Sequence, residues 1–220
     1  MLMRSCGPSS AAVLHILPRS MLVIMLWLVV CGVNATAQQA SELEGWAIDT
    51  ATLDHFQREY GDAAAQRILS WQYLLDHLRG KPEGIVLDEV NRFFNQVRFL
   101  GDVDHWNQMD YWATPLELLA TNGGDCEDFA IAKYFSLKWL GVPVGKMRLT
   151  YVKAVELNQA HMVLTYYASI GQEPMVLDNL VNDILPASQR SDLVPVYSFN
   201  GDGLWKAKLT GDDSRLGDAD

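Results

Sequence analysis

A cysteine, a histidine and an aspartate occur in this chain in an order that could build an activated thiol nucleophile. Cys126 lies in the segment NGGDCED, residues 122–128, which predicts the first turn of a buried helix. His161 and Asp178 follow in segments that alternate like strands. A helix N-terminus favours negative charge and lowers the pKa of a thiol there, and a histidine oriented by a third group completes the activation. The pattern predicts a cysteine hydrolase.

Each residue has an expected role in acyl transfer. The Cys126 thiolate attacks a peptide carbonyl, His161 takes and returns the proton, and Asp178 fixes the imidazole tautomer. The backbone N–H of Cys126 at the helix start is the expected oxyanion donor, and no second donor is assigned. Asp178 is preferred because it lies between apolar residues of a strand, where a carboxylate needs a partner. The alternatives are Asp183 as the orienting acid and His55, His77 or His105 as the base.

Three acidic residues surround the thiol: Asp125, Glu127 and Asp128. Unscreened carboxylates raise the pKa of a neighbouring thiol, and a bound cation would remove that effect. The group is therefore either a calcium site or a solvated capping cluster, with Asp125 as the N-cap. Calcium prefers about six to eight oxygen ligands, so the acid-rich loop 102–110 and backbone carbonyls would have to contribute.

The first 37 residues have the pattern of a secretory signal peptide. Arg4 and Arg19 precede an unbroken apolar run at 21–30, and Ala35-Thr36-Ala37 gives a small-residue cleavage pattern. An uncleaved membrane anchor is the alternative. The whole chain has 220 residues and a formal net charge of −10, so loss of the two leader arginines leaves 183 residues with a charge of −12. So acidic a chain argues against nucleic acid as a partner and favours divalent cations as ligands.

Cleavage of the leader also removes two of the three cysteines and leaves Cys126 alone. An exported domain with a single thiol has no disulfide to form. Cys126 is therefore either an inert core residue or a residue kept for its reactivity.

Hydrophobic periodicity predicts an α+β domain over residues 38–209, with helices first and an antiparallel sheet after them. The tail 210–220 is acidic and is expected to be disordered. The expected helices are 53–60, 63–78, 87–99, a short one from about 115, and 126–140. The expected strands are 147–155, 161–168, 175–180, 194–199 and 204–208.

The register of one hairpin determines whether the catalytic residues can meet. If the reversal within 167–174 centres on Ile170-Gly171, the numbers of paired residues add up to 341. Val163 then faces Asp178, and His161 is a diagonal neighbour of Asp178 on the same face. A shift of one residue would place the two side chains on opposite faces.

Four segments together resemble the bacterial transglutaminase-like cysteine proteinases. They are DYWATP at 110–115, GDCEDFAIAKY at 124–134, AHMVL at 160–164 and VLDNL at 176–180. The resemblance implies a papain/transglutaminase-like fold and a catalytic triad of Cys126, His161 and Asp178. It also implies calcium-dependent activity, with acidic ligands that fall on Asp125, Glu127 and Asp128.

The resemblance further implies a biological setting. The family acts in the periplasm on the N-terminal region of a large surface adhesin, which it cuts at a paired-alanine site during biofilm dispersal. An inner-membrane receptor for cyclic di-GMP sequesters the protease. Rival interpretations are a transamidase or cell-wall peptide hydrolase with the same thiol chemistry, and a calcium-binding interaction module without activity.

Overall fold

The computed structural model describes residues 47–169, 171–206 and 214–218. The predicted leader 1–37 lies outside the described residues. The helical part comprises α2 (Thr50–Tyr60), α3 (Asp62–Leu78), α4 (Glu83–Phe94), α5 (Asp102–Trp106), α6 (Pro115–Thr121) and α7 (Cys126–Trp139). The sheet strands are β3 (Met147–Ala154), β4 (Gln159–Tyr166), β5 (Met175–Leu177), β6 (Leu185–Pro186), β7 (Leu193–Asn200), β8 (Gly203–Lys206) and β9 (Ser214–Asp218).

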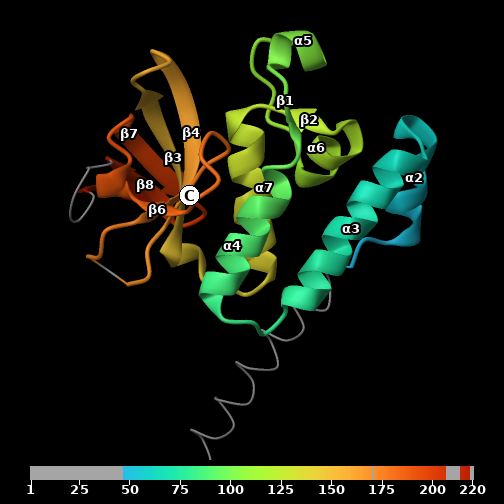
Figure 1. Cartoon of the computed structure of the whole chain (residues 1–220), viewed down its shortest axis with the longest axis horizontal. Coiled ribbons are helices and arrows are strands. Elements are labelled where there is room, and N and C mark those ends of the chain that lie inside the picture. The colour runs from blue at the N-terminus through green and yellow to red at the C-terminus, as the bar shows by residue number, and fades with distance from the viewer. Residues whose placement is uncertain (1–46, 170, 207–213, 219–220) are drawn as a thin grey trace, which may run out of the picture. The chain divides into compact units, whose positions relative to one another are not determined.

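The buried helix α7 lies between the sheet and the other helices (Figure 1). It is apolar on nearly all sides because it packs on β3 and β4 as well as on α4 and α6. Trp71 of α3 links this layer to α7, because its indole Nε1 donates to Ser136 Oγ at 2.9 Å and its ring lies 4.8 Å from that of Trp139. Gly141, with φ of +87°, follows the helix end, as expected for a residue in the left-handed region.

The helices predicted at 53–60 and 63–78 and the short helix predicted from about residue 115 are confirmed, with small changes at their ends. The helix predicted at 87–99 is instead α4, Glu83–Phe94. It starts earlier because Pro82 precedes the first turn with a φ of −55°, which suits a helix start. It ends earlier because Arg98–Phe99 forms a short strand, β1, paired in parallel with Gly123–Gly124, β2. This pairing holds the segment before Cys126.

Seven strands form one antiparallel sheet in the order β6-β5-β4-β3-β7-β8-β9. The predicted register is confirmed, since Leu164 pairs with Leu177 and Thr165 with Val176, so the numbers of each pair add up to 341. The predicted final hairpin is also present, with Asn200 paired to Gly203 across a two-residue loop. One sheet face packs on α7, and the other carries a smaller apolar cluster of Val152, Ala154, Val163, Val176 and Leu193.

The prediction of a disordered tail at 210–220 is wrong for Ser214–Asp218, which forms β9 beside β8. Without this strand β8 would be an edge with unpaired backbone groups. Arg215 helps to hold it, because its Nη2 donates to the Asp202 carbonyl oxygen at 2.6 Å and its guanidinium lies over the Trp205 ring. The domain therefore extends beyond the predicted boundary at 209. The other tail residues, 210–213 and 219–220, lie outside the described residues.

Among the residues that the structure describes, no helix combines the length and apolar character needed to span a membrane.

Candidate active site

Cys126 is the first residue of α7, and Asp125 is its N-cap, as predicted. The chain reaches this point through Gly124, whose carbonyl accepts a hydrogen bond of 2.9 Å from the Leu100 N–H. A Cβ on Gly124 would lie 2.5 Å from Asp128 Oδ2, so only glycine leaves room for that carboxylate. Asp128 uses this room to accept the Asp125 N–H at 3.2 Å. The glycine and the acid together fix the helix start.

His161 and Asp178 form the predicted pair. His161 Nε2 lies 2.7 Å from Asp178 Oδ1, and both side chains are buried. Leu180 N–H also donates to Oδ1 at 3.1 Å, and Arg190 Nη2 donates to Oδ2 at 2.6 Å. Burial alone would raise the pKa of Asp178, but these hydrogen bonds, first that of His161, hold it at about 2. Asp178 is therefore an ionised carboxylate in the folded protein.

The predicted alternatives have other surroundings, although His105 lies against Gly123 in the segment before Cys126. Asp183 lines a surface cavity beside α4, together with Asn95 and Asn182. His55 contacts the Phe56 ring, His77 stacks on Tyr73 and His105 packs edge-on against Trp106.

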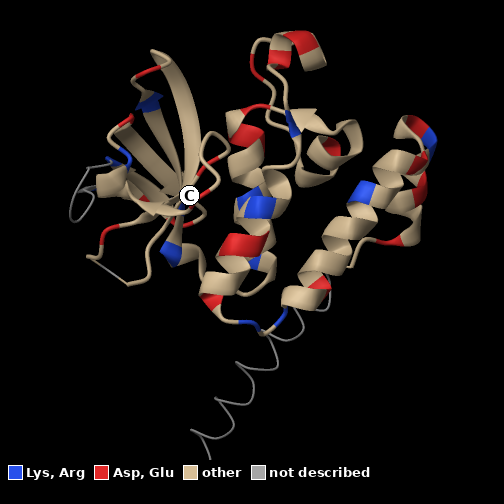
Figure 2. Ribbon diagram, viewed as in Figure 1, with Lys and Arg blue, Asp and Glu red and all other residues tan. Residues whose placement is uncertain are grey.

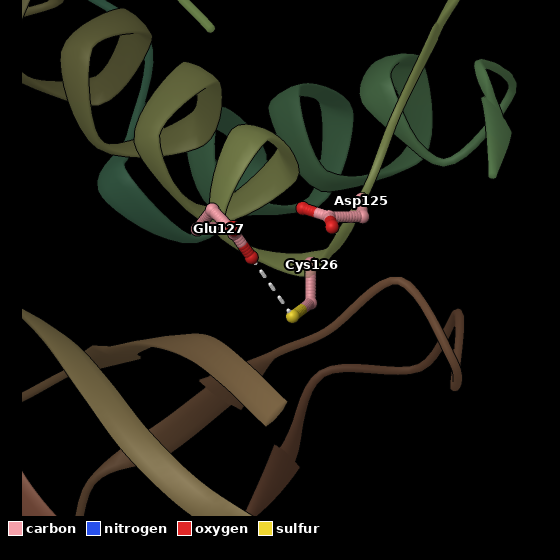
Figure 3. A group of neighbouring side chains, drawn as sticks. All are labelled: Asp125, Cys126 and Glu127. Atoms are coloured by element: carbon pink, nitrogen blue, oxygen red, sulfur yellow. Dashed lines mark hydrogen bonds between the residues drawn. The ribbon is translucent and has the colours of Figure 1, made fainter. Parts of the chain in front are cut away.

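The thiol meets strand β4 next to His161. The Cys126 sulfur accepts a hydrogen bond from the backbone N–H of Met162, which tends to lower the thiol pKa. Figure 3 shows this sulfur pointing toward the strands, with the Glu127 carboxylate reaching toward it. Asp178 binds Nε2 of the His161 ring, so Nδ1 is the ring nitrogen that this carboxylate does not occupy. The thiol therefore contacts the backbone of the residue that follows His161 in β4.

The thiol does not have the lowered pKa that its helix position predicted. Its pKa is raised above the ordinary value, first by burial and then by the charge of Glu127. The thiol donates to Glu127 Oε2 at a sulfur–oxygen distance of 3.2 Å. The effect of the helix N-terminus on the thiol pKa is therefore outweighed by burial of the thiol and by the charge of Glu127.

The acidic cluster has five members: Asp102, Asp110, Asp125, Glu127 and Asp128. Oxygens of Asp102, Asp110 and Glu127 lie within 4.8 Å of one another, and so do oxygens of Asp102, Asp125 and Asp128. Figure 2 shows acidic residues on α5, on the loop after it and at the start of α7. Sequence reasoning named the loop 102–110 as a contributor but did not single out Asp102 and Asp110 among its three acids.

Several carboxylate oxygens of this cluster are poorly satisfied. Asp102 Oδ1 and Asp125 Oδ1 are buried and have no hydrogen-bond partner in the described part of the chain. Burial first, and then the neighbouring acids, raise the pKa of Asp125 to about 9 and that of Asp128 to about 7. Buried carboxyl oxygens that lack donors are suitable ligands for a hard divalent cation, whose charge favours their ionised form. The residues present therefore fit a calcium ion.

Asp128 also accepts two backbone hydrogen bonds that hold the segments around the thiol together. Its Oδ1 accepts the Ala113 N–H at 2.7 Å, while its Oδ2 accepts the Asp125 N–H. Asp102 Oδ2 likewise accepts the Tyr111 N–H at 2.5 Å. The Ala113 bond attaches the loop 110–114 to the start of α7, and the Tyr111 bond attaches the same loop to α5. The acidic side chains therefore also hold the backbone of the site in place.

The sequence matches the family model of the bacterial transglutaminase-like cysteine proteinases over residues 79–199. Calcium-bound LapG of Legionella pneumophila is 46% identical, with a TM-score of 0.67 over 77% of this chain and 93% of that chain. EGTA-treated LapG of the same organism is 44% identical, with a TM-score of 0.66 over 77% of this chain and 91% of that chain. A comparison with curated proteins gave no match.

This chain belongs to the bacterial transglutaminase-like cysteine proteinases. It is a cysteine protease, and the predicted α+β fold of the transglutaminase-like type is confirmed. Family membership agrees with a thiol at a helix start beside a buried histidine–carboxylate pair.

Sequence reasoning missed Arg190, which binds Asp178. No signal could have found it, because nothing in its neighbourhood predicts that an arginine will be buried. Asp102 could have been found as the acid that begins a helix directly after Gly101, opposite the Cys126 segment.

Proposed function

We propose that this protein is a calcium-dependent cysteine endopeptidase with Cys126, His161 and Asp178 as its triad. The observation that carries the proposal is the buried His161–Asp178 pair, 2.7 Å apart, beside the Met162 amide that binds the thiol. His161 donates through Nε2 to Asp178, so its Nδ1 is the base that takes the thiol proton. Protonated His161 then returns the proton to the leaving amine.

The carbonyl oxygen of the scissile bond needs donors at the point where negative charge develops. The backbone N–H of Cys126 is free of the helix ladder because it lies in the first turn. This N–H is the proposed oxyanion donor. Asp178 remains ionised throughout and stabilises the imidazolium that forms on His161.

The proposed calcium ligands are Asp125, Glu127 and Asp128, with Asp102 and Asp110 from the facing loop. Bound calcium would supply positive charge that screens these carboxylates. Glu127 would then no longer favour the neutral thiol, which lets Cys126 ionise. The relatives LapG, calcium-bound and EGTA-treated, support the choice of metal.

The proposed substrate is the N-terminal region of a large surface adhesin with a paired-alanine site. The proposed regulator is an inner-membrane receptor for cyclic di-GMP that sequesters the protease. The proposed location is the periplasm, reached through the leader 1–37. Similarity to LapG supports these proposals.

The test is incubation of the purified protein without its leader with N-terminal adhesin fragments, in excess calcium or in EGTA. We expect cleavage with calcium, little in EGTA, and none with Cys126→Ala. Asp102→Asn should raise the calcium concentration required, whereas the exposed Asp104→Asn on the same short helix is the matched control. Full activity in EGTA would remove calcium from the proposal, and incorporation of a labelled amine into a glutamine peptide without cleavage would favour a transamidase.

A further inference from the structure

Arg190 is a buried cation directly behind the histidine–carboxylate pair. Its side chain is 3% exposed, and it lies between a short 3-10 turn, Ala187–Gln189, and the start of β7. Nη2 donates to Asp178 Oδ2 at 2.6 Å. Asp192 holds the same guanidinium from the other side, through Nε at 2.9 Å and Nη2 at 2.8 Å. The guanidinium therefore joins two carboxylates, one of which is the partner of His161.

We propose that Arg190, held by Asp192, is a positioning residue that fixes the Asp178 carboxylate against His161. This inference rests on the proposed triad. His161 can present Nδ1 to the thiol only while Asp178 Oδ1 holds Nε2, and Arg190 determines where Oδ1 lies by binding Oδ2. A bidentate contact with Asp192 fixes the plane of the guanidinium itself, which an ammonium group could not provide.

The contacts of Asp178 show why a third group is needed. Oδ1 accepts from His161 and from the Leu180 N–H, and Oδ2 accepts only from Arg190 among the described residues. Without Arg190 the second oxygen would be buried and unpaired. A buried carboxylate in that state rotates toward water or takes up a proton, and either change releases His161.

A second buried basic residue, Lys133, also lies near Asp178 and allows the effect of charge to be separated from that of a hydrogen bond. Lys133 of α7 is 1% exposed, and its charge interacts with that of Asp178. Its Nζ has no hydrogen-bond partner in the described part of the chain. Lys133 can therefore change the potential at Asp178 but cannot fix its orientation, so it provides the matched control for Arg190.

Arg190 also lines a cavity of about 40 Å³ on the face of the sheet away from α7. The remaining lining is largely apolar and includes Val163 and Val176. Arg190 Nη1 has no hydrogen-bond partner among the residues that the structure describes. Truncation of Arg190 to alanine would enlarge this cavity by the volume of the guanidinium. Free guanidinium at low millimolar concentration should then enter it and bind Asp178.

The experiment uses calcium-loaded protein without its leader and four variants, Arg190→Gln, Arg190→Ala, Arg190→Lys and Lys133→Met. We expect Arg190→Gln to lower kcat for adhesin cleavage about 10- to 100-fold with little change in KM, as is usual for outer partners of catalytic groups. Arg190→Lys should recover part of the loss, and Lys133→Met should retain kcat. Guanidinium should restore Arg190→Ala, while the same concentration of sodium should not.

Two readouts do not depend on the substrate. The alkylation rate of Cys126 by iodoacetamide should fall with kcat in Arg190→Gln, and the His161 ring should lose its single Nε2–H tautomer by nitrogen NMR. If the wild-type protein cleaves no adhesin fragment, these two readouts still decide the role of Arg190. Folded Arg190→Gln with wild-type kcat and alkylation rate would overturn the inference.

Asp192→Asn covers the case in which Arg190→Gln does not fold. Asp192 is only partly buried, so its amide variant loosens the guanidinium and retains the Arg190–Asp178 contact. We expect an intermediate loss of kcat in this variant. Unchanged kcat together with an unchanged His161 spectrum would contradict the positioning role.

Discussion

Lys133→Met should stabilise this protein, and by an amount that depends on pH. Lys133 is fully enclosed on α7, and its Nζ lacks a hydrogen-bond partner among the described residues. Burial lowers its pKa from 10.5 to about 7, against the opposing attraction of Asp178. A methionine would occupy a similar volume without an ammonium group to desolvate.

The magnitude follows from the two pKa values. The folded pKa is lower than the unfolded one, so the unfavourable contribution of Lys133 is fully present below about pH 7. This contribution decreases as the pH rises toward 10.5, because Lys133 then loses its proton in the unfolded chain as well as in the folded protein. A difference of 3.5 between the two pKa values means that Lys133 destabilises the folded protein by about 5 kcal/mol at pH 6. About 2 kcal/mol of this destabilisation remain at pH 9.

Urea unfolding at pH 6 and pH 9, in excess calcium, measures this contribution. We expect the gain in the free energy of unfolding of Lys133→Met to shrink by about 3 kcal/mol between the two values. Lys138→Met, at the exposed end of the same helix, is the matched control and should change stability little at either pH. A pH-independent effect, or a destabilised Lys133→Met, would refute the burial of an unpaired ammonium group.

Three further predictions test other parts of the structure. Gly124→Ala should destabilise the protein by about 1–3 kcal/mol and weaken its stabilisation by calcium in a thermal melt, because the new Cβ would lie 2.5 Å from Asp128 Oδ2. An unchanged melt would contradict the close approach. Ser136→Ala should cost about 1–3 kcal/mol in urea unfolding because it leaves the Trp71 N–H buried without its acceptor, and a neutral result would argue against that bond. Asp178→Asn should lose a contribution of about 2 kcal/mol that is present above pH 3.8 and disappears as the pH falls through 2, so its stability should change less with acid than that of the wild type.

The local pattern was sufficient to predict the part of the site that lies on regular elements. Asp125 before an apolar helix predicted where α7 begins, and the expected reversal within 167–174 predicted the register that brings His161 and Asp178 to the same face. Both features depend on periods of two or about four residues, which are visible in a single sequence.

The rest depends on contacts between segments far apart in the chain. Asp102 reaches the Cys126 segment only because α5 folds back on it, and Arg190 reaches Asp178 from the loop before β7. The predicted end of the helix at 87–99 was wrong because Arg98–Phe99 pairs with the glycines before Cys126, and this pairing overrides helical periodicity. The predicted direction of the shift in the thiol pKa was wrong, because burial and the charge of Glu127 outweigh the effect of the helix N-terminus.

The tail prediction failed for a related reason. An acidic composition near a chain end favours disorder, but it contains no information about an unpaired strand elsewhere. The edge of β8 supplies the backbone partners that Ser214–Asp218 uses. Composition alone could not reveal that edge.

The central claim is that calcium, bound by the acidic cluster, allows Cys126 to become a thiolate that His161 activates. The most direct measurement is the rate of Cys126 alkylation by iodoacetamide at neutral pH, in calcium and in EGTA, for the wild type and His161→Ala. We expect a fast rate with calcium in the wild type, a slow rate in EGTA, and a slow rate in His161→Ala under both conditions. A wild-type rate in calcium no faster than that of a free peptide thiol would contradict it.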